Sequence, residues 1–152
     1  MINVFVASDH AGLDLKKQIL DEMKSVEGYE FFDLGTENKD SCDYPIFAHR
    51  VVKRLKMYDY SFGVLICGTG IGMSIAANRY AWIREALCCN EKMAEMARRH
   101  NDANVIVFGA KIISPEEALK SLKRFLSEDF EGEERHVRRL NMINQLIYGE
   151  EE

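Results

Sequence analysis

A cysteine followed by alternating glycines is the part of this sequence best suited to chemistry. Cys67 ends an apolar run, and Gly68, Gly70 and Gly72 follow it. Glycines spaced in this way let backbone N–H groups approach an anion just before a helix begins. The same N–H groups and the helix dipole would stabilise a thiolate at Cys67. The segment predicts an oxyanion cradle beside a reactive cysteine. The alternative is a tight turn after a small buried residue.

Two histidines lie beside other polar residues where helices are expected to begin or end. His10 follows Asp9, and His100 precedes Asn101. Each histidine is a candidate for chemistry or, alternatively, for helix capping. His49 lies inside a predicted helix with no polar neighbour of interest, and we interpret it as structural.

Arg135 and Arg139 are four residues apart and share one face of a predicted helix. Two guanidinium groups in this arrangement suit a phosphate better than a solvated surface. Glu131 and Glu134 are the acidic residues that could pair with them instead.

The remaining cysteines predict no metal site and no disulfide framework. Cys42, Cys88 and Cys89 lack the C-x2-C spacing of a zinc site. We interpret Cys88 and Cys89 as core or spectator thiols and Cys42 as a surface turn residue. Reduced thiols indicate a cytoplasmic protein.

Length and composition predict one globular domain, residues 1–149, followed by a frayed, solvated end at residues 150–152. The chain has 152 residues, of which 47% are hydrophobic, and a formal net charge of -5. The start is unlike a signal peptide, and no segment approaches the roughly 20 apolar residues that span a bilayer. We therefore expect no membrane partner, and the acidic balance argues against nucleic acid as a partner.

Short apolar runs alternate with amphipathic stretches along the chain. The expected strands are residues 2–7, 29–34, 62–67, 83–88 and 104–108, and the expected helices are 13–23, 46–57, 72–80, 91–100, 115–126 and 133–148. Strands without a polar face favour a mostly parallel sheet covered by helices. The pattern predicts a Rossmann-like, three-layer, doubly wound α/β domain with five strands and a further C-terminal helix. Ligands of such folds bind beyond the carboxyl ends of the strands, here the loops 8–12, 33–36, 67–72 and 109–111.

Six motifs, in order along the chain, closely resemble type B ribose-5-phosphate isomerase. They are Ser-Asp-His-Ala-Gly at 8–12, Asp-Tyr-Pro at 43–45, Cys-Gly-Thr-Gly-Ile-Gly-Met-Ser at 67–74, Ala-Ala-Asn at 76–78, His-Asn-Asp-Ala-Asn at 100–104 and Arg-His at 135–136. This family also includes the galactose-6-phosphate and allose-6-phosphate isomerases.

The resemblance implies reversible isomerisation of ribose 5-phosphate and ribulose 5-phosphate through an enediolate, in the pentose phosphate pathway and without metal or cofactor. Cys67 would carry the proton between carbons, and His100 would open the sugar ring. Thr69 and Asp43 would move hydroxyl protons. The family implies a homodimer or a dimer of dimers with a shared site.

The resemblance also assigns the groups that would bind the substrate. The backbone of Gly68, Gly70, Ile71 and Gly72 would hold the enediolate oxygen, Asp9, Tyr44 and Asn101 would orient the open chain, and His10, Arg135 and Arg139 would hold the phosphate. Some members use a glutamate just after the glycine loop, but this chain has Met73 there. Lys111 stands where the family usually has an arginine.

Other functions stay open at this point. The nearest alternative is an isomerase of a hexose 6-phosphate, allose or galactose. A thiol-dependent hydrolase or transferase would also use a cysteine beside a histidine and an oxyanion loop. A non-catalytic phosphosugar-binding domain would explain the arginine pair but would give Cys67 and His100 no role.

We predict that Lys111→Arg keeps or raises kcat/KM for ribose 5-phosphate. The substitution restores the planar guanidinium that this family uses, whereas lysine keeps only the charge. Steady-state kinetics of the variant and the wild type test this. A large loss of activity would mean that the pocket is adapted to lysine.

Overall fold

A parallel sheet with helices on both faces forms the body of the protein. The computed structural model describes residues 1–149. The strands are β1 (Ile2–Ser8), β2 (Tyr29–Asp33), β3 (Phe62–Cys67), β4 (Glu85–Leu87) and β5 (Val105–Gly109). The helices are α1 (Leu13–Met23), α2 (Tyr44–Met57), α3 (Ile71–Ala77), α4 (Glu91–Asn101), α5 (Pro115–Ser127) and α6 (Glu134–Tyr148). Every element expected from the sequence is present, although β4 and α3 are shorter than expected. The end predicted to be frayed, residues 150–152, lies outside the described residues.

The strands have the order β2-β1-β3-β5-β4, and all the pairs are parallel. The chain first winds from β1 outward to β2 and then builds the other half of the sheet from β3. The winding therefore reverses between β1 and β3, the position where open α/β sheets bind ligands. The predicted doubly wound architecture is confirmed.

Two apolar cores fill the space between the sheet and its helices. Side chains of α1, α4 and α5 cover one face, where they pack on strand residues such as Val64 and Ile106. Side chains of α2 and α3 cover the other face, packing on residues such as Leu65 and Val107. Successive residues of a strand point to opposite faces, so strands buried on both sides are apolar throughout.

An ion pair between a buried lysine and an exposed aspartate fixes the loop that follows β2. The side chain of Lys16 is only 1% exposed, and its Nζ lies 2.7 Å from Oδ1 of Asp33. The same ammonium donates to the Thr36 carbonyl at 2.5 Å. Asp33 in turn accepts the Gly35 N–H at 2.9 Å. Helix α1 thereby holds the carboxyl end of β2 and the loop that leads toward α2.

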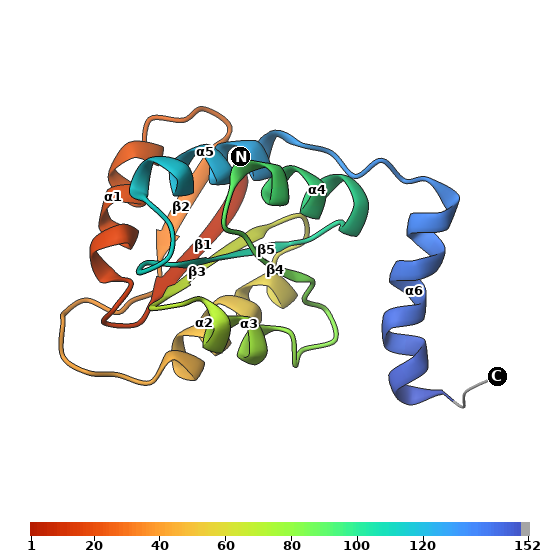
Figure 1. The fold of residues 1–152 in the computed structure, drawn as a ribbon, viewed down its shortest axis with the longest axis horizontal. Coiled ribbons are helices and arrows are strands. Elements are labelled where there is room, and N and C mark those ends of the chain that lie inside the picture. The colour runs from red at the N-terminus through yellow and green to blue at the C-terminus, as the bar shows by residue number, and fades with distance from the viewer. Residues whose placement is uncertain (150–152) are drawn as a thin grey trace.

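Helix α6 stands apart from the layered body (Figure 1). Asn144 donates to the Ala81 carbonyl at 2.9 Å, which is one of its few links to the body. Its apolar stripe remains open, with Ile143 52% and Ile147 68% exposed. The sequence left open whether this stripe packs on the domain or on a partner, and in one chain it is largely uncovered.

Among the described residues, no helix combines the length and the apolar character needed to cross a membrane.

Candidate functional site

The sulfur of Cys67 lies at the turn where β3 passes into α3. The Gly70 N–H donates to Cys67 Sγ at 3.2 Å, and the cysteine is only 4% exposed. The Ile71 N–H points to Thr69 Oγ1 at 3.3 Å. A thiolate here would receive an N–H hydrogen bond at the start of a helix, and both features stabilise negative charge.

Glycines at this turn are required by close approach and by backbone conformation. Gly70 has a φ of +81°, which side chains of L-residues rarely allow. A Cβ atom at Gly109, the last residue of β5, would collide with the backbone of Thr69. A Cβ atom at Gly72 would lie 2.6 Å from Cζ of Tyr44. The glycines let the loop after β3 pack directly against two neighbouring segments.

Asp9 and His10 follow β1, the strand next to β3. Asp9 is buried, and its Oδ1 accepts the Gly12 N–H at 3.1 Å. His10 accepts the Cys42 N–H on Nδ1 at 3.2 Å. A neutral His10 that accepts on Nδ1 carries its proton on Nε2, so Nε2 can donate to an anion. We expected Cys42 to be a surface turn residue, but it is half-buried and orients His10.

Three further residues of the expected site reach the same edge of the sheet. Asp43 is the N-cap residue of α2, and Tyr44 begins that helix with its ring against Gly72. The Asp43 side chain makes no capping hydrogen bond to α2 and is exposed. The aliphatic part of the Lys111 side chain lies over the loop after β3, since a Cβ atom at Gly68 would be 3.6 Å from Cε of Lys111.

The other expected site residues lie at the opposite end of the molecule. Helix α4 runs from the carboxyl end of β4 back to the amino end of β5, so His100 and Asn101 in its last turn lie at the amino edge of the sheet. Arg135 and Arg139 are exposed on α6, which follows from that end. One chain therefore does not bring these four residues to Cys67.

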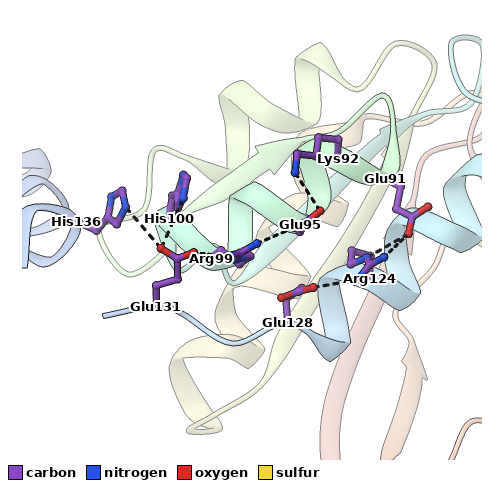
Figure 2. A network of polar contacts seen from close by, with 9 residues as sticks. All are labelled: Glu91, Lys92, Glu95, Arg99, His100, Arg124, Glu128, Glu131 and His136. Atoms are coloured by element: carbon purple, nitrogen blue, oxygen red, sulfur yellow. Dashed lines mark hydrogen bonds and ion pairs between the residues drawn. The ribbon is translucent and has the colours of Figure 1, made fainter. Parts of the chain in front are cut away.

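At the amino edge, Glu131 joins several side chains (Figure 2). Its Oε1 lies 2.6 Å from Nη2 of Arg99, and its Oε2 lies 3.7 Å from Nε2 of His100. The sequence suggested Glu131 or Glu134 as partners of the arginine pair. That suggestion was wrong for Arg135, which pairs with Glu133 instead.

Two other interpretations can now be checked. His49 was expected to lack a polar neighbour, but its Nδ1 lies 2.7 Å from the Tyr80 hydroxyl. Tyr80 follows α3 along the chain, and the spacing in sequence gave no sign of this contact. Cys88 is 1% exposed, and burial raises the pKa of its thiol to about 12. It is a core residue, as predicted.

A partly buried glutamate, which the sequence did not single out, anchors α3. The Ser74 hydroxyl donates to Oε1 of Glu85, a residue of β4, at 3.3 Å. Asn78 Nδ2 donates to Oε2 of Glu85 at 2.9 Å. Asn78 also accepts the Glu85 N–H at 2.9 Å. Burial raises the pKa of Glu85 to about 7. The only signal of it in the sequence was a pair of charged residues, Arg84 and Glu85, inside the expected strand 83–88.

The fold and this edge of the sheet define a doubly wound α/β enzyme with a cysteine and a glycine loop at the switch point. The model of the Ribose/Galactose Isomerase family matches residues 4–143. The chain therefore belongs to this family, and its class is that of the aldose–ketose isomerases.

Similar proteins are known from bacteria. Ribose-5-phosphate isomerase B of Escherichia coli is 36% identical over 146 residues, which cover 96% of this chain and 97% of that protein. The ribose 5-phosphate isomerase structure from Thermotoga maritima has a TM-score of 0.91 and 43% identity, covering 95% of this chain and 99% of that one. The enzyme from Mycoplasma genitalium, solved with bound ribulose-5-phosphate, has a TM-score of 0.90 and 39% identity, with 97% of each chain covered.

We predict that Glu85 makes stability depend on pH. Because its pKa is about 7 in the folded protein against an ordinary 4.5, the folded form binds the proton more tightly. The free energy of unfolding should therefore fall as pH rises through this interval. Glu85→Gln keeps an acceptor oxygen for Asn78 and places an amide N–H, in place of the second acceptor oxygen, beside the Ser74 hydroxyl, without the charge. It should be more stable than the wild type by about 2 kcal/mol at pH 8.

Urea unfolding at pH 5 and pH 8 measures the effect. Glu30→Gln, an exposed glutamate on the other edge strand, is the matched control and should leave the pH dependence unchanged. Equal pH dependence in Glu85→Gln and the wild type would contradict the prediction.

Proposed function

We propose that this chain interconverts ribose 5-phosphate and ribulose 5-phosphate through an enediolate, with Cys67 as the proton carrier. The observation that carries the proposal is the 3.2 Å contact from the Gly70 N–H to Cys67 Sγ, at the switch point of the sheet. All three relatives named above are called ribose-5-phosphate isomerases, and one of them holds bound ribulose-5-phosphate. These likenesses support the same substrate here.

The proposed chemistry needs a base, an oxyanion site and a route for hydroxyl protons. The Cys67 thiolate removes the proton from C2 of the open aldose, and the electron pair forms the enediolate. Backbone N–H groups of the segment 68–72 stabilise the oxygen that becomes negative. Thr69 and Asp43 move the hydroxyl proton from O2 to O1, and Cys67 returns its proton to C1. Asp43 suits this role because its carboxylate is exposed and makes no capping hydrogen bond to α2.

The remaining roles require a second copy of the chain. His100 would protonate the ring oxygen and Asn101 would orient the open sugar, while Arg135 and Arg139 would bind the phosphate together with His10. His100 and Cys67 lie at opposite edges of the sheet in one chain. Each site therefore takes the groups around Cys67 from one subunit and the groups around His100 from the other. We propose a homodimer, or a dimer of dimers, with the site between copies.

Exposed apolar side chains support this assembly. Ile71 and Ile75 on α3 are each 55% exposed, beside the cysteine loop. Leu146 and Ile147 on α6 are 55% and 68% exposed. Apolar surface of this kind on two helices favours burial against another copy.

The physiological sugar phosphate is proposed to be the pentose, with an allose or galactose 6-phosphate as the alternative within the family. The ratio of kcat/KM values for the three sugar phosphates distinguishes them. We also propose that the enzyme works in the cytoplasm, in the pentose phosphate pathway. The four free thiols suit a reducing compartment.

We predict that Cys67→Ala lowers turnover of ribose 5-phosphate by about 10² to 10⁴, the usual contribution of a positioned base. The variant keeps the loop and the phosphate groups, so binding should persist. Exchange of the C2 proton with deuterated solvent should fall in parallel. Cys89→Ala, which removes an exposed thiol, is the control and should retain activity. If Cys67→Ala folds, binds and keeps more than about a tenth of the exchange rate, the proton carrier is another residue, and Asp43 is the next to test.

We predict that two inactive variants restore each other when their subunits mix. Cys67→Ala and His100→Ala each damage both sites of a symmetric dimer. A mixed dimer has one site with both defects and one intact site. Random mixing should therefore restore about a quarter of wild-type activity.

Co-expression with two affinity tags isolates the mixed dimer for assay. A double variant Cys67→Ala/His100→Ala, mixed with the wild type, is the control, because its mixed dimers contain no intact site. Inactive mixed dimers of the two single variants would contradict a shared site.

A further inference from the structure

Three side chains from different segments converge at the amino edge of the sheet (Figure 2). His100 lies in the last turn of α4, Glu131 lies in the connection between α5 and α6, and His136 lies in the first turn of α6. Oε2 of Glu131 is 3.7 Å from Nε2 of His100 and 4.0 Å from Nε2 of His136. The imidazole rings are stacked, with centroids 4.4 Å apart. One carboxylate oxygen thus faces two ring nitrogens.

The nitrogen of His136 in this cluster is buried without a partner. The side chain is only 9% exposed, and Nε2 makes no hydrogen bond to any of the described residues. A buried polar atom left unpaired is costly, and in native proteins such atoms usually meet a water, an ion or a ligand.

The arginines around the cluster have carboxylate partners of their own. Arg99 binds Oε1 of Glu131 at 2.6 Å and Glu95 at 2.9 Å, and Arg135 pairs with Glu133. Oε2 of Glu131 therefore remains directed at the histidines. The positive charges nearby would weaken binding of a cation, so a bound ion would exchange rather than stay permanently.

We propose that His100, Glu131 and His136 form a binding site for a divalent transition-metal ion, with Zn²⁺ as the preferred occupant. Two imidazole nitrogens and one carboxylate oxygen are ligands that Zn²⁺ favours. The three ligand atoms lie within 4.8 Å of one another. Tetrahedral Zn²⁺ with bonds of about 2.0–2.1 Å needs separations near 3.4 Å. The side chains must therefore move closer together, and His100, 37% exposed, has room to do so.

The consequence for activity rests on the proposed function. A metal ion bound to His100 occupies the nitrogen that would protonate the sugar ring. Zn²⁺ would then act as a reversible inhibitor, and a chelator would restore turnover. Three protein ligands leave a fourth coordination position for water or for an oxygen of the sugar phosphate.

Titration of the intact, chelator-treated protein with Zn²⁺, and with Co²⁺ as a spectroscopic probe, tests the site without any sugar. We expect one ion per chain and a Co²⁺ spectrum without thiolate charge-transfer bands. Glu131→Gln and His136→Gln should each weaken binding at least tenfold. His49→Gln removes a histidine outside the cluster and should not.

Thiolate bands, unchanged affinity in both cluster variants or no binding up to about 1 mM metal would overturn the site. Because binding is measured without substrate, this result is separate from the isomerase assay. Binding in a protein that does not turn over ribose 5-phosphate would support the metal site and count against the proposed function. Full turnover at saturating Zn²⁺ would overturn the inhibition.

Discussion

The parallel direction of all five strands is the constraint on which the rest of this structure depends. Parallel strands place their carboxyl ends at one edge, and the helices that return the chain end at the other edge. Loops that follow strands, such as the one after Cys67, meet at the first edge. Helix ends, such as His100 on α4, meet at the second. The division of polar residues between two ends follows from the winding and not from their spacing in sequence.

Close packing of backbone at the carboxyl edge determines what Cys67 can do. The loop after β3 lies against β5 at Gly109 and against Tyr44 at Gly72, and neither position has room for a Cβ atom. Gly70 takes a left-handed conformation, and its N–H points at the sulfur. The cysteine is buried but faces a backbone donor, a setting that suits a thiolate better than a purely apolar core does. At Cys88, in the core, burial raises the pKa of the thiol to about 12.

Carboxylates organise both ends of the molecule in different ways. At the carboxyl edge, Asp33 neutralises the buried Lys16 and so fixes the loop beyond β2. At the amino edge, Glu131 divides its two oxygens between Arg99 and a pair of stacked histidines. Each arrangement joins segments that lie far apart along the chain. Removing either carboxylate would leave positive or polar groups without their partner, which is costly where they are buried.

The sequence by itself determined the fold class, the positions of nearly all helices and strands, and the cysteine loop. Apolar strands and amphipathic helices have periods that neighbouring residues reveal, and the glycines after Cys67 stand together in the chain. Tertiary structure alone decided the contact of Cys42 with His10, the role of Glu85 beneath α3 and the meeting of Glu131 with His136. It also decided that His100 and Cys67 lie at opposite edges. These outcomes depend on how segments far apart in the chain pack together, and local patterns of residue type do not determine that packing.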